Sequence, residues 1–263
     1  MRITRNIPLR RAPNLAYDLY EPQDAAGPLQ SIHFVYGGSW RTGLRGCYAF
    51  VGAALARRGF RVLIPDYRLF PEAAFPDFVY DVAAGFAEAT ELNDHPTRAA
   101  ALVAHSAGAH MAALVCTDPR YLQAFGSGLP RPSAFVGMSG PYVFDPTTWN
   151  TTAEIFTAAA DEPDRARPIA LANPTFPRTL LVHGARDTLV TPNATELFAA
   201  RLRELQVPVE KTIVAWAAHA GPILAFARPA SMVSSILSDT VMFLKRSPPT
   251  LDPSPVLDGA LRA

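Results

Sequence analysis

The sequence has little of several features that mark particular classes of protein. Only two of its 263 residues are cysteines, Cys47 and Cys116, which excludes a disulfide framework and a zinc site built on cysteines. The sequence also has no large excess of charge of either sign, because 24 Lys and Arg residues are balanced by 23 Asp and Glu residues. A net charge of +1 creates no field that would draw the chain to nucleic acid or to an anionic membrane surface. We therefore expect neither nucleic acid nor a membrane among its partners.

The start of the chain lacks the apolar core and small-residue cleavage site of a secretory signal peptide. One long uncharged run, residues 99–117, contains two histidines, a serine and a glycine in its middle, which indicates strand, turn and helix rather than a membrane span. The hydrophobic fraction of 49% is ordinary for a globular protein and excludes general disorder. These features predict a cytoplasmic protein that is a monomer or a homodimer.

Short apolar segments alternate with helical patterns along most of the chain. The expected strands are rich in β-branched and aromatic residues and cover residues 15–20, 30–36, 61–65, 100–104, 134–138, 179–182 and 211–216. The expected helices cover residues 48–58, a segment that opens at Pro76, 194–205 and 223–243. This alternation predicts an α/β fold with a mostly parallel central sheet covered by helices on both faces, formed by residues 1–246 as a single domain.

Two segments interrupt the alternation. Residues 141–177 are mixed polar, aromatic and proline-rich, and they are too long for a plain connection. We expect them to form a small cap-like insertion with a short helix at residues 153–160, and no large lid domain. Residues 247–263 contain four prolines and are expected to form a loosely held C-terminal tail.

The most informative segment is residues 102–110, Leu-Val-Ala-His-Ser-Ala-Gly-Ala-His. A buried strand runs into small-X-Ser-X-Gly and then into an alanine-rich helix, which is the setting of a nucleophile elbow. At such a turn Ser106 would project from the sheet, and Gly108 would let strand and helix approach. Ala104 stands where glycine is usual and adds one methyl group. A serine that only caps a helix is the alternative interpretation.

Three further pieces strengthen the catalytic interpretation. Gly37 and Gly38 end an early strand, where flexible backbone can turn N–H groups toward an oxyanion, although a plain glycine turn would look the same. Asp187 follows the strand at residues 179–182, and His219 follows the strand at residues 211–216. Ser106, Asp187 and His219 occur in the order expected for a nucleophile, an orienting acid and a base. No histidine pair has metal-ligand spacing and no glycine-rich loop matches a phosphate motif, so we expect neither a metal nor a cofactor.

With these residues the sequence resembles the α/β-hydrolase esterases of the hormone-sensitive-lipase and kynurenine-formamidase type over roughly residues 15–245. The motifs that carry the resemblance are Tyr-Asp-Leu-Tyr-Glu-Pro at residues 17–22, Tyr-Gly-Gly-Ser-Trp at 36–40, Asp-Tyr-Arg-Leu-Phe-Pro-Glu at 66–72, His-Ser-Ala-Gly at 105–108 and His-Gly-Ala-Arg-Asp at 183–187.

By that resemblance the N–H groups of Gly38, Ser39 and Ala107 would form the oxyanion hole, and Gly37 would shape its loop. The chain departs from the family at Tyr36, where a histidine is usual, and at Ala104.

The resemblance implies a serine hydrolase that cleaves small carboxylic esters through an acyl-enzyme. An arylformamidase, which cleaves an N-formyl amide with the same machinery, is one alternative, and a non-catalytic binding protein with a hydrolase fold is another. We expect a modest pocket that prefers short acyl chains and is lined by aromatic and apolar side chains, namely Tyr36, Trp40, Phe144, Trp149 and Ile223.

Overall fold

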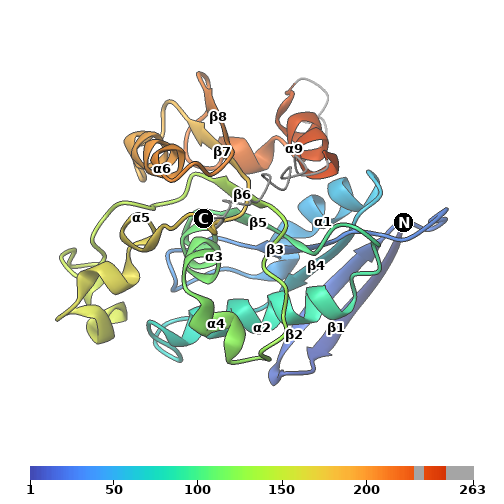
Figure 1. Ribbon diagram of the computed structural model, residues 1–263, viewed down its shortest axis with the longest axis horizontal. Helices are drawn as coiled ribbons and strands as arrows, with labels where there is room; N and C mark the ends of the chain where they lie inside the picture. Colours follow the sequence, from blue (N-terminus) through green and yellow to red (C-terminus); the bar gives the residue numbers. More distant parts are fainter. Residues whose placement is uncertain (228–233, 247–263) are drawn as a thin grey trace, which may run out of the picture.

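A single sheet of eight strands forms the centre of the computed structural model, which describes residues 1–227 and 234–246 (Figure 1). The spatial order of the strands is β1-β2-β4-β3-β5-β6-β7-β8. Their bounds are β1 Arg2–Leu9, β2 Ala12–Glu21, β3 Ser31–Val35, β4 Arg61–Pro65, β5 Ala101–His105, β6 Phe135–Met138, β7 Thr179–Gly184 and β8 Val209–Val214. The six strands β3 to β8 run parallel to one another, whereas β1 pairs antiparallel with β2 and β2 with β4. The predicted α/β class with a mostly parallel sheet is confirmed.

Helices cover both faces of this sheet. Helices α1 (Ala49–Ala56) and α9 (Ile236–Lys245) lie on one face, and α2 (Asp77–Glu91), α3 (Ala107–Thr117) and α4 (Pro119–Gln123) lie on the other (Figure 1). Helix α6 (Asn193–Glu204) connects β7 to β8. A sheet that is covered on both sides needs strands that are apolar on both sides, and every residue of β3 and β5 is buried accordingly.

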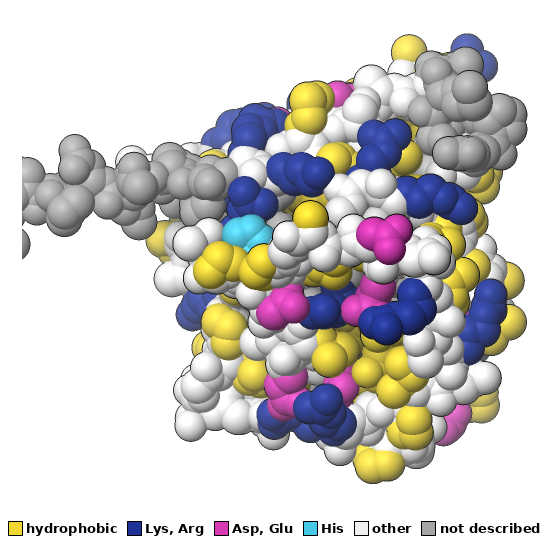
Figure 2. Space-filling view, turned by 90° about the vertical axis from the view of Figure 1, so that its right-hand side faces the viewer, with side chains coloured by type: hydrophobic (Ala, Val, Ile, Leu, Met, Phe, Trp, Pro, Cys, Tyr) yellow, Lys and Arg dark blue, Asp and Glu magenta, His cyan; other side chains and the backbone are white. Residues whose placement is uncertain are grey.

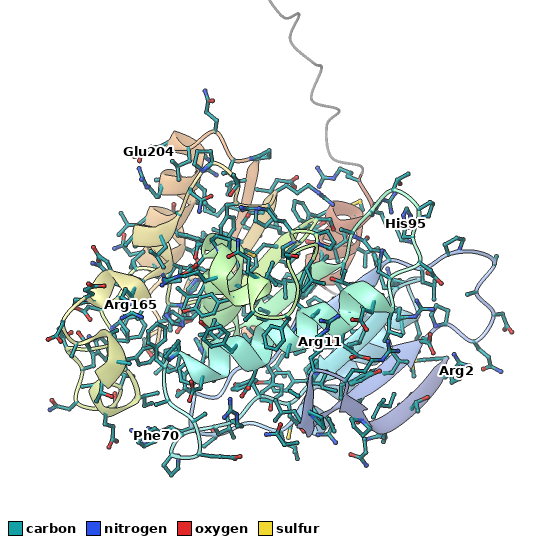
Figure 3. All side chains as sticks on the ribbon, turned by 60° about the horizontal axis from the view of Figure 1, so that its bottom comes forward. Arg2, Arg11, Phe70, His95, Arg165 and Glu204 are labelled. Atoms are coloured by element: carbon teal, nitrogen blue, oxygen red, sulfur yellow. The ribbon has the colours of Figure 1, made fainter. Side chains whose placement is uncertain are left out.

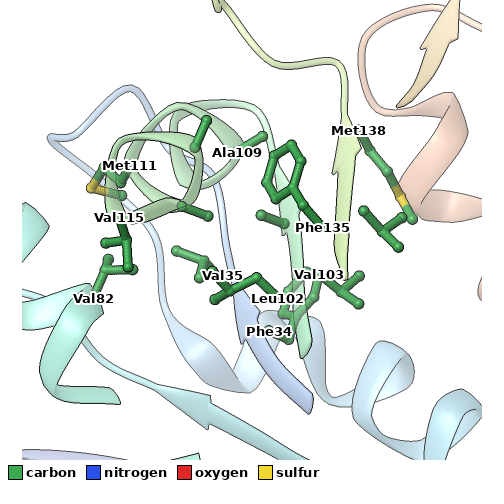
Figure 4. Close-up of a cluster of buried hydrophobic side chains, with 14 of the residues drawn as sticks. Phe34, Val35, Val82, Leu102, Val103, Ala109, Met111, Val115, Phe135 and Met138 are labelled. Carbon is green, nitrogen blue, oxygen red and sulfur yellow. The ribbon is translucent and has the colours of Figure 1, made fainter. Parts of the chain in front are cut away.

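The core between β5 and helix α3 positions the functional segment. Val35, Leu102 and Phe135 come from three neighbouring strands and point to the same face of the sheet. Met111 and Val115 of α3 belong to the same cluster of buried side chains (Figure 4). Each such side chain contributes roughly 1.5–3 kcal/mol when it is fully buried. The end of β5 and the start of α3 are therefore fixed by the most apolar part of the molecule.

The N-terminal hairpin was missed by the sequence analysis, which placed the first strand at residues 15–20. Strand β1 precedes it and pairs with β2. Most side chains of β1 are exposed because it is an edge strand, so it carries arginines and an asparagine instead of an apolar run. Figure 2 shows acidic and basic side chains next to one another on the lower part of this side of the molecule. Arg2 of β1 pairs with Glu21, and Arg10, which follows β1, pairs with Glu91.

The continuous helix expected at residues 223–243 is wrong. Helix α7 (Gly221–Leu224) ends after one turn, and α9 begins only at Ile236. Pro229 lies between them in the sequence, and a proline is not tolerated inside a helix without a kink. The predicted tail, residues 247–263, lies outside the described residues.

Residues 141–177 form short turns instead of the helix expected at residues 153–160. They comprise the 3₁₀ turns Ala153–Ile155, Thr157–Ala159 and Pro163–Ala166 and the short helix α5 (Pro168–Leu171). The insertion, marked by Arg165, lies on the same side of the molecule as the loop with Phe70 (Figure 3). The hydrogen bonds that join it to the rest of the fold include those from the Phe75 N–H to the Ile155 carbonyl at 2.9 Å and from His110 Nε2 to the Ala166 carbonyl at 2.7 Å.

Candidate active site

Ser106 occupies a sharp turn between β5 and α3. Its φ of 54° and ψ of −126° lie in a region that non-glycine residues rarely adopt. The Ser106 N–H donates to the Met138 carbonyl of β6 at 2.9 Å, and the first turn of α3 starts directly after it. Strained backbone of this kind is typical of functional sites, and the geometry is that of the predicted elbow.

Gly108 is required by the close approach of helix α3 to strand β3. A Cβ on Gly108 would lie 2.7 Å from the Val35 carbonyl carbon and closer still to the carbonyl oxygens of Val35 and Tyr36. By contrast, the extra methyl group of Ala104 is accommodated, because its side chain is fully buried and Gly137 stands opposite it on β6. The departure from the usual glycine at position 104 therefore leaves the turn intact.

Ser106, His219 and Asp187 are brought together by three different loops at the carboxyl ends of the strands. His219 Nε2 lies 2.8 Å from Ser106 Oγ, and His219 Nδ1 lies 2.7 Å from Asp187 Oδ2. Because the carboxylate can only accept hydrogen bonds, it orients the proton of the imidazole to Nδ1 and leaves Nε2 free to accept one.

The carboxylate of Asp187 is completely buried and receives four hydrogen bonds. The N–H groups of Leu189 and Val190 donate to Oδ1 at 3.0 and 2.9 Å. Oδ2 accepts from His219 and also from His183 Nε2, at 3.0 Å. A buried charge needs such partners, since an isolated one costs far more than it contributes. The sequence analysis includes His183 only as part of the motif at residues 183–187 and missed this contact.

The backbone of His219 is held from the opposite side. Its carbonyl oxygen accepts hydrogen bonds from Ser139 Oγ at 2.9 Å and from His105 Nε2 at 3.3 Å. Burial, together with the neighbouring His219, lowers the pKa of His105 to about 4, so His105 is neutral at pH 7. His105 thus supports the loop that carries His219, whereas Ser106, the next residue, faces the imidazole.

The loop after β3 lies directly against the elbow. A Cβ on Gly37 would be 2.8 Å from the Ser106 Cβ, and a Cβ on Gly38 would collide with the Thr42 carbonyl. Ser39 has a φ of 52°, again in the left-handed region. The N–H groups of Gly38, Ser39 and Ala107 donate to no atom of residues 1–227 or 234–246. They are available as donors beside Ser106 Oγ.

Tyr36 supports this loop from below. Its ring stacks on Tyr67, with 4.6 Å between centroids, and on Tyr48, with 5.7 Å. The Tyr67 hydroxyl donates to the Tyr36 carbonyl at 3.1 Å, and the Tyr36 hydroxyl lies 3.5 Å from Asp66 Oδ1. Asp66 is itself paired with Arg45. Burial raises the pKa of Tyr36 to about 12, so its hydroxyl keeps its proton and can donate.

A cavity of about 450 Å³ opens above Ser106 and Ala107. Trp40, Phe144 and Trp149 line it as expected, and the other lining residues include Ser39, Arg41, Thr151, Thr188, Leu189 and Val190. Tyr36 and Ile223 are not among the lining residues, which corrects the expectation for these two positions. Both are buried in the core instead, because Tyr36 lies beneath the loop and Ile223 faces inward from α7.

The described residues contain neither a membrane-spanning helix nor a cluster of metal ligands. No helix in residues 1–227 or 234–246 is both long and apolar enough to span a membrane. Within the same residues, no three His, Cys, Asp or Glu side chains are grouped in a way that could hold a metal ion.

The chain is similar in sequence to known esterases. The family model described as BD-FAE matches residues 17–125. A probable isoprenylcysteine alpha-carbonyl methylesterase of Oryza sativa is 33% identical over 151 residues, which are 54% of this chain and 35% of the relative. Esterase LipC of Mycobacterium tuberculosis is 28% identical over 196 residues, 67% of this chain and 49% of the relative. The chain thus spans about half the length, or less, of these curated relatives.

Solved structures share the fold at lower identity. An esterase from Thermogutta terrifontis has a TM-score of 0.75 at 20% identity, with 92% of this chain and 91% of that chain covered. A carbohydrate esterase from gut microbiota has a TM-score of 0.74 at 19% identity, with 93% and 95% covered. The α/β-hydrolase fold and the resemblance to esterases are both confirmed.

Proposed function

We propose that this chain is a serine hydrolase that cleaves small carboxylic esters through an acyl-enzyme. The observation that carries the proposal is the hydrogen-bonded series Ser106, His219 and Asp187 at the floor of an open cavity. The similarity to a methylesterase and to an esterase supports ester hydrolysis as the reaction class. Fold alone would be a poor guide, because hydrolase folds carry many activities.

In the first half-reaction His219 Nε2 takes the proton of Ser106 Oγ as the oxygen attacks the ester carbonyl carbon. The carbonyl oxygen becomes an oxyanion, which the N–H groups of Gly38, Ser39 and Ala107 stabilise by hydrogen bonds. The tetrahedral intermediate then breaks its bond to the alcohol oxygen. That oxygen receives the proton from His219, so the alcohol leaves as a neutral molecule and the acyl group stays on Ser106.

In the second half-reaction a water molecule replaces the alcohol. His219 takes one proton from the water as its oxygen attacks the acyl carbon, and the same backbone N–H groups stabilise the new oxyanion. Collapse of this intermediate breaks the bond to Ser106 Oγ, which regains the proton from His219. The products are a carboxylic acid and the original enzyme.

The remaining expectations extend this proposal. Residues 1–246 would form one catalytic domain, with residues 141–177 as a small insertion that supplies one wall of the cavity. The partner would be a small molecule, and the chain would act in the cytoplasm as a monomer or a homodimer. The balanced charge of the sequence draws the chain neither to nucleic acid nor to an anionic membrane surface, which favours a small molecule as the partner.

The test is a panel of p-nitrophenyl esters together with N-formylkynurenine, assayed with the wild type, Ser106→Ala and Ser127→Ala. Ser127 is an exposed serine and serves as the matched control. We expect ester turnover to fall on the order of 10⁴-fold or more in Ser106→Ala alone, while the protein stays folded. An organophosphate should label only the peptide that contains Ser106. Strong preference for the formamide would favour an arylformamidase, and no turnover of any substrate would favour a binding protein.

A further inference from the structure

His183 is a buried histidine that contacts the orienting acid and has no part in the reaction steps above. It lies near the end of β7, and its side chain is completely inaccessible to solvent. Its Nε2 is 3.0 Å from Asp187 Oδ2 and 2.8 Å from the Val190 carbonyl oxygen. Its Nδ1 is 2.7 Å from Thr195 Oγ1 on helix α6. Both ring nitrogens therefore have partners in the protein.

These partners determine where the proton of His183 resides. The carboxylate and the carbonyl that face Nε2 can only accept hydrogen bonds, so Nε2 carries a proton. Burial is the largest cause that lowers the pKa of His183, and the ring is neutral at pH 7. Nδ1 then has no proton, and the Thr195 hydroxyl donates to it. Nε2 thus sets the tautomer, and Thr195 fixes the orientation of the ring by its hydrogen bond to Nδ1.

We propose that His183 is a positioning residue that holds Asp187 Oδ2 against His219, and that Thr195 keeps the ring of His183 in the orientation this requires. The proposal rests on the proposed function, because it concerns the acid that orients the base. It extends the series from Ser106, His219 and Asp187 to five groups by adding His183 and Thr195, which come from β7 and α6.

Because His183 donates a hydrogen bond to the carboxylate of Asp187, its removal should change the pH dependence of the reaction. Removal of a purely steric contact would not. The titratable groups that face His219 are Asp187, His183 and His105. At neutral pH the two histidines are uncharged, so Asp187 supplies the charge. The hydrogen bond from His183 draws electron density from Oδ2. Its loss would make the carboxylate and imidazole together bind a proton more tightly, and the acidic limb of the kcat/KM profile would move to higher pH.

Two pairs of variants test this. His183→Phe removes the donor and keeps a ring, whereas His183→Gln can place an N–H near the position of Nε2. Thr195→Val removes the hydroxyl that orients the ring of His183, whereas Thr195→Ser retains it. In His183→Phe the pH of half-maximal kcat/KM should rise by about one unit, because the carboxylate of Asp187 loses a hydrogen-bond donor that stabilises its charge.

The other three variants should show smaller shifts of the acidic limb than His183→Phe. Thr195→Val should show a smaller rise in the same direction, and His183→Gln and Thr195→Ser should stay near the wild-type profile. An acidic limb that is unchanged in both His183→Phe and Thr195→Val would overturn the proposal, even if kcat fell. Should His183→Phe fail to fold, the two Thr195 variants decide the question alone.

A readout without substrate separates this inference from the proposed function. The titration midpoint of His219 can be followed by NMR in histidine-labelled wild type and Thr195→Val. A midpoint that rises in the variant supports the positioning role whether or not the wild type cleaves esters. An equal midpoint overturns it, while absence of ester turnover with a shifted midpoint would overturn only the proposed function.

Discussion

Gly108→Ala is the substitution whose effect follows most directly from the structure. Its new Cβ would lie 2.7 Å from the Val35 carbonyl carbon, and nearer to the carbonyl oxygens of Val35 and Tyr36. Carbon atoms in ordinary contact are about 3.5–4.0 Å apart, so helix α3 and the end of β3 must separate by about 1 Å. Both sides of this contact are backbone, so no side-chain rotation can relieve it.

The separation acts on the catalytic geometry more than on stability. The end of β3 leads into Gly38 and Ser39, while the start of α3 carries Ser106 and Ala107, so the two sets of oxyanion donors would move apart. A misplacement of about 1 Å can cost about 10²-fold in rate. Overpacking in a core costs about 1–3 kcal/mol, which a domain of this size can absorb. We therefore expect kcat to fall about 10²-fold in a protein that remains folded.

The assay is steady-state hydrolysis of p-nitrophenyl butyrate, combined with thermal unfolding followed by circular dichroism. Gly128→Ala is the matched control, because a Cβ on Gly128 meets no atom within 4 Å. The control should keep the wild-type rate. A Gly108→Ala variant with wild-type kcat would refute the reasoning, since the donors would then tolerate the shift or contribute nothing.

Three other predictions concern the loop, the buried histidines and the cavity. Tyr36→Phe keeps the ring stacking and loses only the hydrogen bond of 3.5 Å to Asp66. The kcat should therefore fall by less than the ~10²–10³-fold that the loss of a direct oxyanion donor causes, with KM unchanged. An unchanged kcat would show that the hydroxyl has no role in turnover. Burial lowers the pKa of His33 to about 3 and that of His110 to about 4, so the unfolded state binds more protons between about pH 4 and 6.5. The free energy of unfolding, measured with urea, should therefore fall as the pH drops through this range. In His110→Asn the slope of this free energy against pH should decrease by up to about 1.4 kcal/mol per pH unit. An equal slope in the variant would contradict a lowered pKa of His110. The cavity of about 450 Å³ lies toward the small end of ligand pockets, so esters of two to six acyl carbons should be cleaved faster than a C16 ester, without activation at an oil–water interface; faster cleavage of the C16 ester would indicate a lipase.

Much of the fold was predictable because its signals are local. A parallel strand that is buried on both faces must be a short apolar run, and β4 and β5 have that form in the sequence. The elbow is equally local, because strand, strained serine and helix follow one another within a few residues. Strand β1 has no such signal, since an edge strand with exposed side chains resembles a loop in composition.

The surroundings of Tyr36 and His183 could not be predicted in the same way. Tyr36 follows the strand of the oxyanion loop, and the sequence alone does not reveal whether its ring enters the cavity or the core. The rings of Tyr48 and Tyr67 decide this, and they come from two other segments of the chain. His183 likewise acquires its partner Thr195 only when α6 packs beside β7.

The difference between these cases lies in what each residue type reveals about its neighbours. No Cβ fits at positions 37 and 108, so both must be glycine. The two glycines in the sequence therefore indicate that loop, strand and helix approach one another closely. Histidine and threonine occur for many reasons, and neither type reveals which atoms will face it. The steric frame of this site could therefore be inferred from the sequence, whereas the hydrogen bonds that orient Asp187 within that frame required the three-dimensional structure.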